Sequence, residues 1–143
     1  MSYTYRDDIA KADAAFEASG RTIEELFIAA ADATMNIMVE NIAAIQKKQG
    51  LAFELESEAL DILLLNFINE LIFLKDARCL LLRIENISIR KTDTKFVLKT
   101  KVYGEEPDPG KHSLCVDVKA ATLHRLSVKQ TGQGWLATVV LDI

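Results

Sequence analysis

Apolar residues recur at helical spacing in two segments of the first half of the chain. In the first segment, Thr22 can serve as a helix cap, and Glu25 stands three residues later, which is the spacing of a capping box. The apolar positions that follow predict a helix near Thr22–Val39. A second helix is predicted near Glu58–Asp76, with Ser57 as its cap. Apolar residues cover most of the surface of this second helix, so we expect it to be buried on most sides.

Alternation of apolar and polar residues dominates the rest of the chain and predicts strands. Both prolines fall in Gly104–Gly110, which we expect to form a loop. Helices in the first half and strands in the second favour an α+β fold, with two principal helices on one face of a mostly antiparallel sheet. A length of 143 residues suits a single domain, 1–143. The expected strands are Tyr3–Asp8, Ala14–Ala18, Leu51–Glu56, Leu81–Ile89, Phe96–Tyr103, Val116–Val118, Leu123–Val128 and Trp135–Ile143.

The charge balance argues against a protein that binds nucleic acid by charge alone. Acidic residues outnumber basic ones by 21 to 17, whereas such domains are usually basic. If RNA is involved, we expect a partner to hold it. The most apolar segment, Leu60–Leu74, is shorter than the ~20 residues of a membrane span and contains Asp61 and Glu70, so a core helix is expected. Met1–Asp8 is polar and does not resemble a signal peptide, which favours the cytoplasm.

No familiar catalytic or phosphate-binding motif is present in the sequence. Cys79 and Cys115 have no neighbours at metal-ligand spacing, and their apolar surroundings predict two buried thiols. His112 and His124 are each isolated, and an isolated histidine is more often a structural residue than a base or a ligand. A catalytic role for this chain is therefore not the favoured interpretation.

The end of the chain, in contrast, contains a candidate binding site. A predicted strand runs into Leu141-Asp142-Ile143, so the terminus ends on an apolar residue and can be docked rather than frayed. A docked end would place the Asp142 side chain beside the terminal carboxylate. Two adjacent anions repel unless a basic residue or a cation lies between them, and calcium prefers several such oxygens. The alternative is a solvated terminal carboxylate.

Five stretches, in order along the chain, are similar to one known family. They are Gly20–Phe27 (Gly-Arg-Thr-Ile-Glu-Glu-Leu-Phe), Asn69–Leu74 (Asn-Glu-Leu-Ile-Phe-Leu), Val102–His112 (Val-Tyr-Gly-Glu-Glu-Pro-Asp-Pro-Gly-Lys-His), Asp117–His124 (Asp-Val-Lys-Ala-Ala-Thr-Leu-His) and the closing Leu-Asp-Ile. On these stretches the whole chain resembles the archeases.

The resemblance implies an accessory protein rather than an enzyme. Archeases assist an RtcB-type RNA ligase, which joins RNA during tRNA splicing, by promoting its guanylylation and its multiple turnover. On this reading the ligase is the partner, RNA is bound only through it, and no membrane is involved. Two alternatives are a metal-dependent hydrolase built on Asp13 and Asp142, and a general chaperone or modulator of nucleic-acid enzymes. A chaperone should expose an apolar patch, for which Leu81–Tyr103 is a candidate region.

The resemblance also implies the site residues. The metal ligands of the family correspond to Asp13, Asp142 and the terminal residue Ile143, with calcium as the expected divalent ion, and its basic residue corresponds to Lys119. Spacing to Gly20 favours Asp13 over a rival alignment on Asp7 or Asp8. Where the family has His-Thr-Ala-Asp, this chain has Ala10-Lys11-Ala12-Asp13, and Lys11 could supply part of the charge of a cation.

Overall fold

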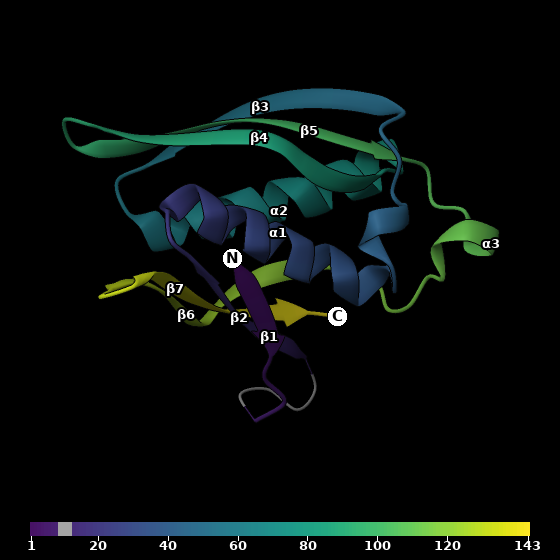
Figure 1. Ribbon diagram of the computed structural model, residues 1–143, viewed down its shortest axis with the longest axis horizontal. Coiled ribbons are helices and arrows are strands. Elements are labelled where there is room, and N and C mark those ends of the chain that lie inside the picture. The colour runs from purple at the N-terminus through teal and green to yellow at the C-terminus, as the bar shows by residue number, and fades with distance from the viewer. Residues whose placement is uncertain (9–12) are drawn as a thin grey trace.

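The two principal helices lie between two antiparallel sheets in the computed structural model, which describes residues 1–8 and 13–143 (Figure 1). A four-stranded sheet has the order β1-β2-β7-β6, and a three-stranded sheet has the order β3-β5-β4. The α+β class, the two main helices and the antiparallel pairing are as predicted. The elements are β1 (Ser2–Tyr5), β2 (Ala14–Gly20), α1 (Ile23–Met38), η1 (Ile42–Ala44), β3 (Gln49–Ser57), α2 (Leu60–Arg78), β4 (Leu81–Thr92), β5 (Lys95–Glu105), α3 (Pro109–His112), β6 (Ala120–Thr131) and β7 (Gly134–Asp142).

The strands divide between two sheets, whereas the sequence suggested one. Strand periodicity tells which side of a strand is buried, but not which strands pair with each other. The second sheet covers the side of the helices that the first leaves open (Figure 1). A helix between two sheets needs apolar residues all round, and this is the pattern that the sequence of α2 shows.

The start of α1 follows from its capping residues. The Thr22 hydroxyl accepts a hydrogen bond from the Glu25 N–H at 3.1 Å, which confirms Thr22 as the N-cap. The Glu25 carboxylate reaches back to the N–H of Arg21 at 3.3 Å, one residue before the usual partner in a capping box. One of the unpaired N–H groups of the first turn, that of Glu25, and the N–H of Arg21 just before the cap are thereby bonded.

The start of α2 differs from the prediction. Ser57 is the last residue of β3, and the helix begins at Leu60 with Ala59 at the cap position and no side-chain cap. The Ser57 hydroxyl instead accepts from the Ala59 N–H at 3.3 Å, within the turn that joins strand to helix. The helix ends where Cys79 adopts the left-handed conformation, with φ of 53°.

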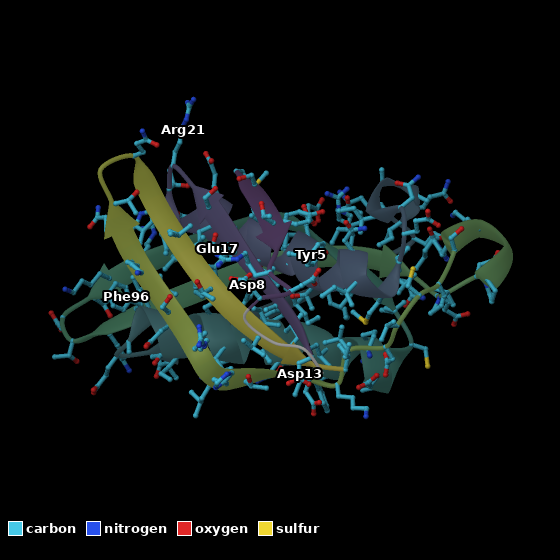
Figure 2. All side chains as sticks on the ribbon, turned by 90° about the horizontal axis from the view of Figure 1, so that it is seen from below. Tyr5, Asp8, Asp13, Glu17, Arg21 and Phe96 are labelled. Atoms are coloured by element: carbon cyan, nitrogen blue, oxygen red, sulfur yellow. The ribbon has the colours of Figure 1, made fainter. Side chains whose placement is uncertain are left out.

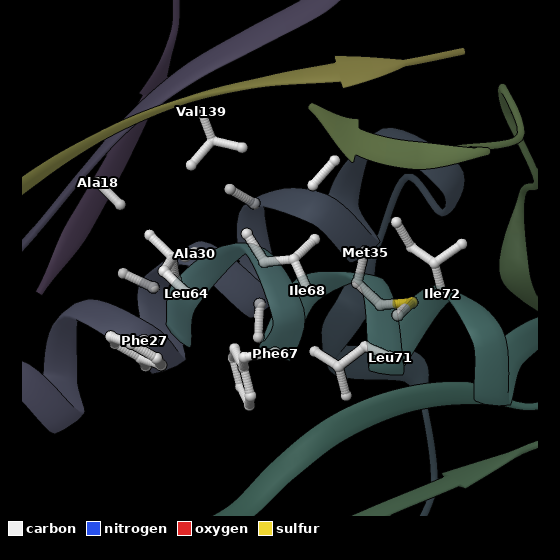
Figure 3. Close-up of a cluster of buried hydrophobic side chains, with 14 of the residues drawn as sticks. Ala18, Phe27, Ala30, Met35, Leu64, Phe67, Ile68, Leu71, Ile72 and Val139 are labelled. Atoms are coloured by element: carbon white, nitrogen blue, oxygen red, sulfur yellow. The ribbon is translucent and has the colours of Figure 1, made fainter. Parts of the chain in front are cut away.

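The core is a continuous set of apolar side chains from the helix layer and the inner faces of both sheets (Figure 3). Within this core, Phe67 of α2 is fully buried. Its ring lies 5.3 Å from that of Phe27 on α1 and 6.2 Å from that of Phe53 on β3, measured between centroids. On the opposite side, Val139 of β7 closes the core. Phe67 therefore links both helices to the three-stranded sheet.

Two further expectations need correction. Cys79 and Cys115 are exposed rather than buried, because Cys79 follows the end of α2 and Cys115 lies in the irregular segment before β6. The segment Val116–Val118 is not a strand, and α3 occupies the end of the expected loop Gly104–Gly110. Within the described residues, no helix is long and apolar enough to cross a membrane.

Candidate functional site at the end of the four-stranded sheet

The register of the four-stranded sheet brings the predicted site residues to one end of that sheet. Ala14 of β2 lies opposite Leu141 of β7, so Asp13, one residue earlier, is next in register to Asp142. On the other side of β7, Ala120 of β6 lies opposite Asp142. Figure 2 shows Asp13 where β7 finishes. Segments far apart in the sequence thus meet at the chain end because β7 is the central partner of β2 and β6.

The chain end is docked, as the sequence suggested. Strand β7 runs to Asp142, and the half-buried side chain of Ile143 packs against the core. Asp142 is exposed, and its carbonyl oxygen accepts the Lys119 N–H at 2.8 Å. The backbone of Lys119 is therefore fixed to the terminal strand, while its side chain is exposed.

Two side chains of α2 hold the segment that carries Lys119. The Lys75 ammonium donates to the Asp117 carboxylate at 2.5 Å and to the Val118 carbonyl at 3.0 Å. Farther along, the Asn69 side chain accepts the Ala121 N–H at 2.8 Å and donates to the Ala121 carbonyl at 3.4 Å. Lys119 lies between these two attachments.

Lys75 remains charged although its side chain is only 8% exposed. Burial acts to lower its pKa, but the hydrogen bonds to Asp117 and Asp76 outweigh burial and raise the pKa above its usual value. The Asp76 oxygen lies at 2.9 Å and the Asp117 oxygen at 2.5 Å, so with the Val118 carbonyl all three ammonium protons have partners.

Asp8 offers the rival alignment, but its carboxylate is already paired. Arg6 donates to both of its oxygens, at 2.9 and 2.7 Å, and this pairing holds the pKa of Asp8 below its usual value despite partial desolvation. Arg6 also pairs with Glu17 at 2.7 Å. Asp13 makes no ion pair of this kind among the described residues. Ala10 and Lys11 lie outside the described residues.

The donor chemistry of the sheet end suits a hard cation. Asp13, Asp142 and the terminal carboxylate of Ile143 offer only oxygen, which calcium prefers and zinc does not. Within residues 1–8 and 13–143, no three His, Cys, Asp or Glu side chains are grouped as a metal site.

A second polar cluster, at the far end of β5, was not found from the sequence. Glu105 is buried, and it accepts from Lys111 at 2.8 Å, from the Gln46 N–H at 2.5 Å and from His112 at 3.1 Å. Lys111 contributes most to lowering the pKa of Glu105 to about 2, against the effect of desolvation. His112 is fully buried, and its other ring nitrogen accepts the Asp108 N–H at 2.8 Å.

Every polar group of this second cluster is therefore satisfied within the protein, and we assign it a structural role. It ties α3 and the segment before β3 to the end of β5. His124 is exposed on β6, and nothing in its surroundings indicates a ligand or a base. The sequence feature that could have revealed this cluster is the stretch Val102–His112, one of the five similar to the archeases, because it contains Glu105, Lys111 and His112.

Known archeases are similar to this chain along nearly its full length. The model of the Archease protein family matches residues 3–143. The protein archease of Pyrococcus abyssi is 38% identical over 133 residues, covering 92% of this chain and 93% of its own. That of Methanosarcina barkeri is 30% identical over 142 residues, covering 99% of this chain and 95% of its own.

Solved structures give the same result for the fold. The solution structure of protein 1598 from Methanobacterium thermoautotrophicum is 28% identical, covers 99% of this chain and 98% of its own, and superposes with a TM-score of 0.84. A crystal structure from Thermotoga maritima, described as an archease and possible chaperone, covers 98% of each chain with a TM-score of 0.61 at 18% identity, and so supports the fold alone. On the sequence matches over its full length, this chain belongs to the archease family.

Proposed function

We propose that this protein activates an RtcB-type RNA ligase, promoting its guanylylation and multiple turnover, and performs no catalysis itself. Family membership supports an accessory role. The observation that carries the proposal is the sheet register, which gathers Asp13, Lys119 and the Asp142–Ile143 terminus from three distant segments at one exposed end. A set of charged groups at an exposed edge is suited to entering the active site of a partner.

Lys119 has the chemistry that such an activator needs. Guanylylation transfers a nucleotide from a triphosphate, so negative charge develops on phosphate oxygens and a nearby cation offsets it. The Lys119 side chain is exposed and has no ion pair among the described residues, while its backbone is bonded to Asp142. Its ammonium group is thus available to a partner and attached to a fixed strand.

The carboxylates beside Lys119 would hold a divalent cation, which we propose to be calcium. Asp13, Asp142 and the terminal carboxylate would be the ligands, and a bound ion would add fixed positive charge at the same edge. In the absence of any counter-charge these carboxylates would repel each other. Their gathering by the register of three strands is the observation that supports the proposal.

A guanylylation assay of the ligase tests the role of Lys119. Lys119→Ala should lower the stimulated rate by about 10-fold or more, because a cation near a developing phosphate charge contributes at the transition state. Lys129→Ala is the matched control, since Lys129 is an exposed lysine near the far end of β6, the strand that begins one residue after Lys119. Equal stimulation by the wild type and by a folded Lys119→Ala variant would contradict the proposal.

Calorimetry tests the cation site separately. A short extension after Ile143 converts the terminal carboxylate to an amide, so calcium binding and ligase stimulation should both weaken. The same extension placed before Met1, a residue that is 62% exposed, is the control and should leave both intact. Calcium binding that is undiminished in the C-terminally extended protein would exclude the terminal carboxylate as a ligand.

A chaperone function is the second candidate, and the distribution of exposed apolar residues bears on it. None of the large exposed apolar side chains of the described residues lies in Leu81–Tyr103, where the sequence suggested a patch. Leu114, Val116 and Leu123 instead lie within five residues of Lys119 along the chain, and Phe73 lies on α2 between Asn69 and Lys75. The test is whether the protein suppresses the aggregation of an unrelated protein, and whether Phe73→Ser reduces that suppression. Equal suppression by the wild type and by Phe73→Ser would argue against a chaperone surface at these residues.

A further inference from the structure

The segment that leads to Lys119 has little regular structure of its own. Between α3 and β6 the backbone makes one isolated bridge, between Val39 and Leu114. The Cys115 N–H donates to the Met38 carbonyl at 2.8 Å, which attaches the first part of the segment to the end of α1. Asp117 to Lys119 lie beyond these bonds. Something else must fix the residues immediately before Lys119.

Lys75 of α2 supplies the first attachment. Its nearly buried ammonium donates hydrogen bonds to the Asp117 carboxylate and to the Val118 carbonyl, so it holds both residues that precede Lys119. The Asp117 side chain is 69% exposed, whereas that of Lys75 is 8% exposed. The attachment is therefore anchored by a nearly buried side chain of the helix.

Asn69 of α2 supplies the second attachment. Strand β6 is at an edge of its sheet, so one side of its backbone has no strand partner. Asn69 bonds both the N–H and the carbonyl of Ala121, as a neighbouring strand would. This fixes the backbone two residues after Lys119, six residues along α2 from Lys75.

We propose that Lys75 and Asn69 are positioning residues that hold the Lys119 side chain in the orientation needed to act on the ligase. The inference rests on the proposed function, because it concerns the same site. Functional groups act when held within about 0.5 Å of the productive geometry by surrounding contacts. The bond between the Lys119 N–H and the Asp142 carbonyl fixes one point of this segment, and the two α2 side chains fix the residues on either side of it.

The first test needs no ligase. Asn69→Ala and Lys75→Met each remove one attachment, and Lys75→Met retains an apolar stem. Hydrogen exchange should then show the Lys119 amide, which donates to Asp142, exchanging at least about 10-fold faster, with the amides of α1 unchanged. Unchanged exchange at Lys119 in both variants would overturn the inference. If one variant fails to fold, the other decides.

The second test measures ligase stimulation at saturating protein, with Lys119→Ala as the reference. Lys75→Met should lower maximal stimulation by about 10-fold, by analogy with other small misplacements of acting groups. The double variant should be no worse than Lys119→Ala alone, because the effect passes through Lys119. Lys95→Met, which removes a surface lysine paired with Glu56 at 2.9 Å, is the control and should have no effect.

The outcomes separate the two proposals. If Lys119→Ala leaves stimulation unchanged, the proposed function fails, and the exchange measurement still decides whether α2 positions the segment. If Lys119→Ala lowers stimulation but Lys75→Met does not, the positioning role is refuted. Losses that add in the double variant would also refute it, since Lys75 would then act independently of Lys119.

Discussion

Phe67 offers a sharp test of the three-layer arrangement, because the same helix contains a matched control. Phe67 is fully buried between α1 and β3, whereas Phe73, six positions later on α2, is 60% exposed. Changing each to alanine makes the same chemical substitution in the same helix. Any gain in helix propensity, about 0.5 kcal/mol, is common to both variants.

The expected magnitudes differ because only one site leaves a cavity. Phe67→Ala should reduce the free energy of unfolding by about 3–5 kcal/mol, the range for a buried phenylalanine. Loss of the ring contacts with Phe27 and Phe53, at 5.3 and 6.2 Å, favours the upper part of that range. Phe73→Ala gives up only partial burial, partly offset by helix propensity, so we expect a change of about 0.5 kcal/mol.

Urea unfolding at equilibrium measures both variants. With a slope of about 2 kcal/mol per molar urea, the midpoint should fall by roughly 1.5–2.5 M for Phe67→Ala and by about 0.3 M or less for Phe73→Ala. Equal shifts for the two variants would contradict the placement of α2 between the sheets. A larger shift for Phe73→Ala would indicate that α2 turns its other side to the core.

Three further predictions follow from single contacts. Thr22→Ala removes the cap of α1 and should lower the free energy of unfolding by about 0.5–2 kcal/mol in urea titrations, whereas a change near zero would refute the capping role. Glu105 has its pKa lowered to about 2 in the folded protein, from 4.5. Its contribution to stability is thus present above pH 4.5 and lost as the pH falls toward 2, so Glu105→Gln should be less stable than the wild type at pH 7, with the difference shrinking in acid. A difference independent of pH would show that the Glu105 charge is not involved. Gly104→Ala should destabilise the protein, because a Cβ there would overlap the Leu81 carbonyl, and thermal unfolding at an unchanged temperature would refute the close approach.

Local signals in the sequence predicted the elements well. Thr22 and Glu25 marked the start of α1 because capping depends on residues only three positions apart. The end of β3 and start of α2 were misplaced because Ser57 is a good cap by type but lies in the strand. Apolar neighbours suggested that the cysteines are buried, yet Cys79 follows the helix end, where backbone geometry and not hydrophobicity sets its position.

Contacts between distant segments could not be read from local patterns. The pairing of β7 with both β2 and β6, which brings Asp13, Asp142 and Lys119 to one end, depends on register between strands more than 100 residues apart for β2 and β7. The apolar end of the chain indicated Asp142, whereas only the family resemblance indicated Asp13 and Lys119. It gave no indication of Lys75, because a lysine in an apolar helix carries no local sign of its partners. The cluster around Glu105 was missed for the same reason, since the Gln46 N–H comes from a separate segment.

The most direct test of the central claim is a multiple-turnover RNA ligation assay. The cognate RtcB-type ligase is incubated with excess cleaved RNA and nucleotide, with and without this protein, and product is counted per ligase molecule. We expect about one product per ligase without the protein and many with it. The number should return toward one when Lys119→Ala replaces the wild type, but not when Lys129→Ala does. An equal number of turnovers with and without the wild-type protein would contradict the claim that it activates the ligase.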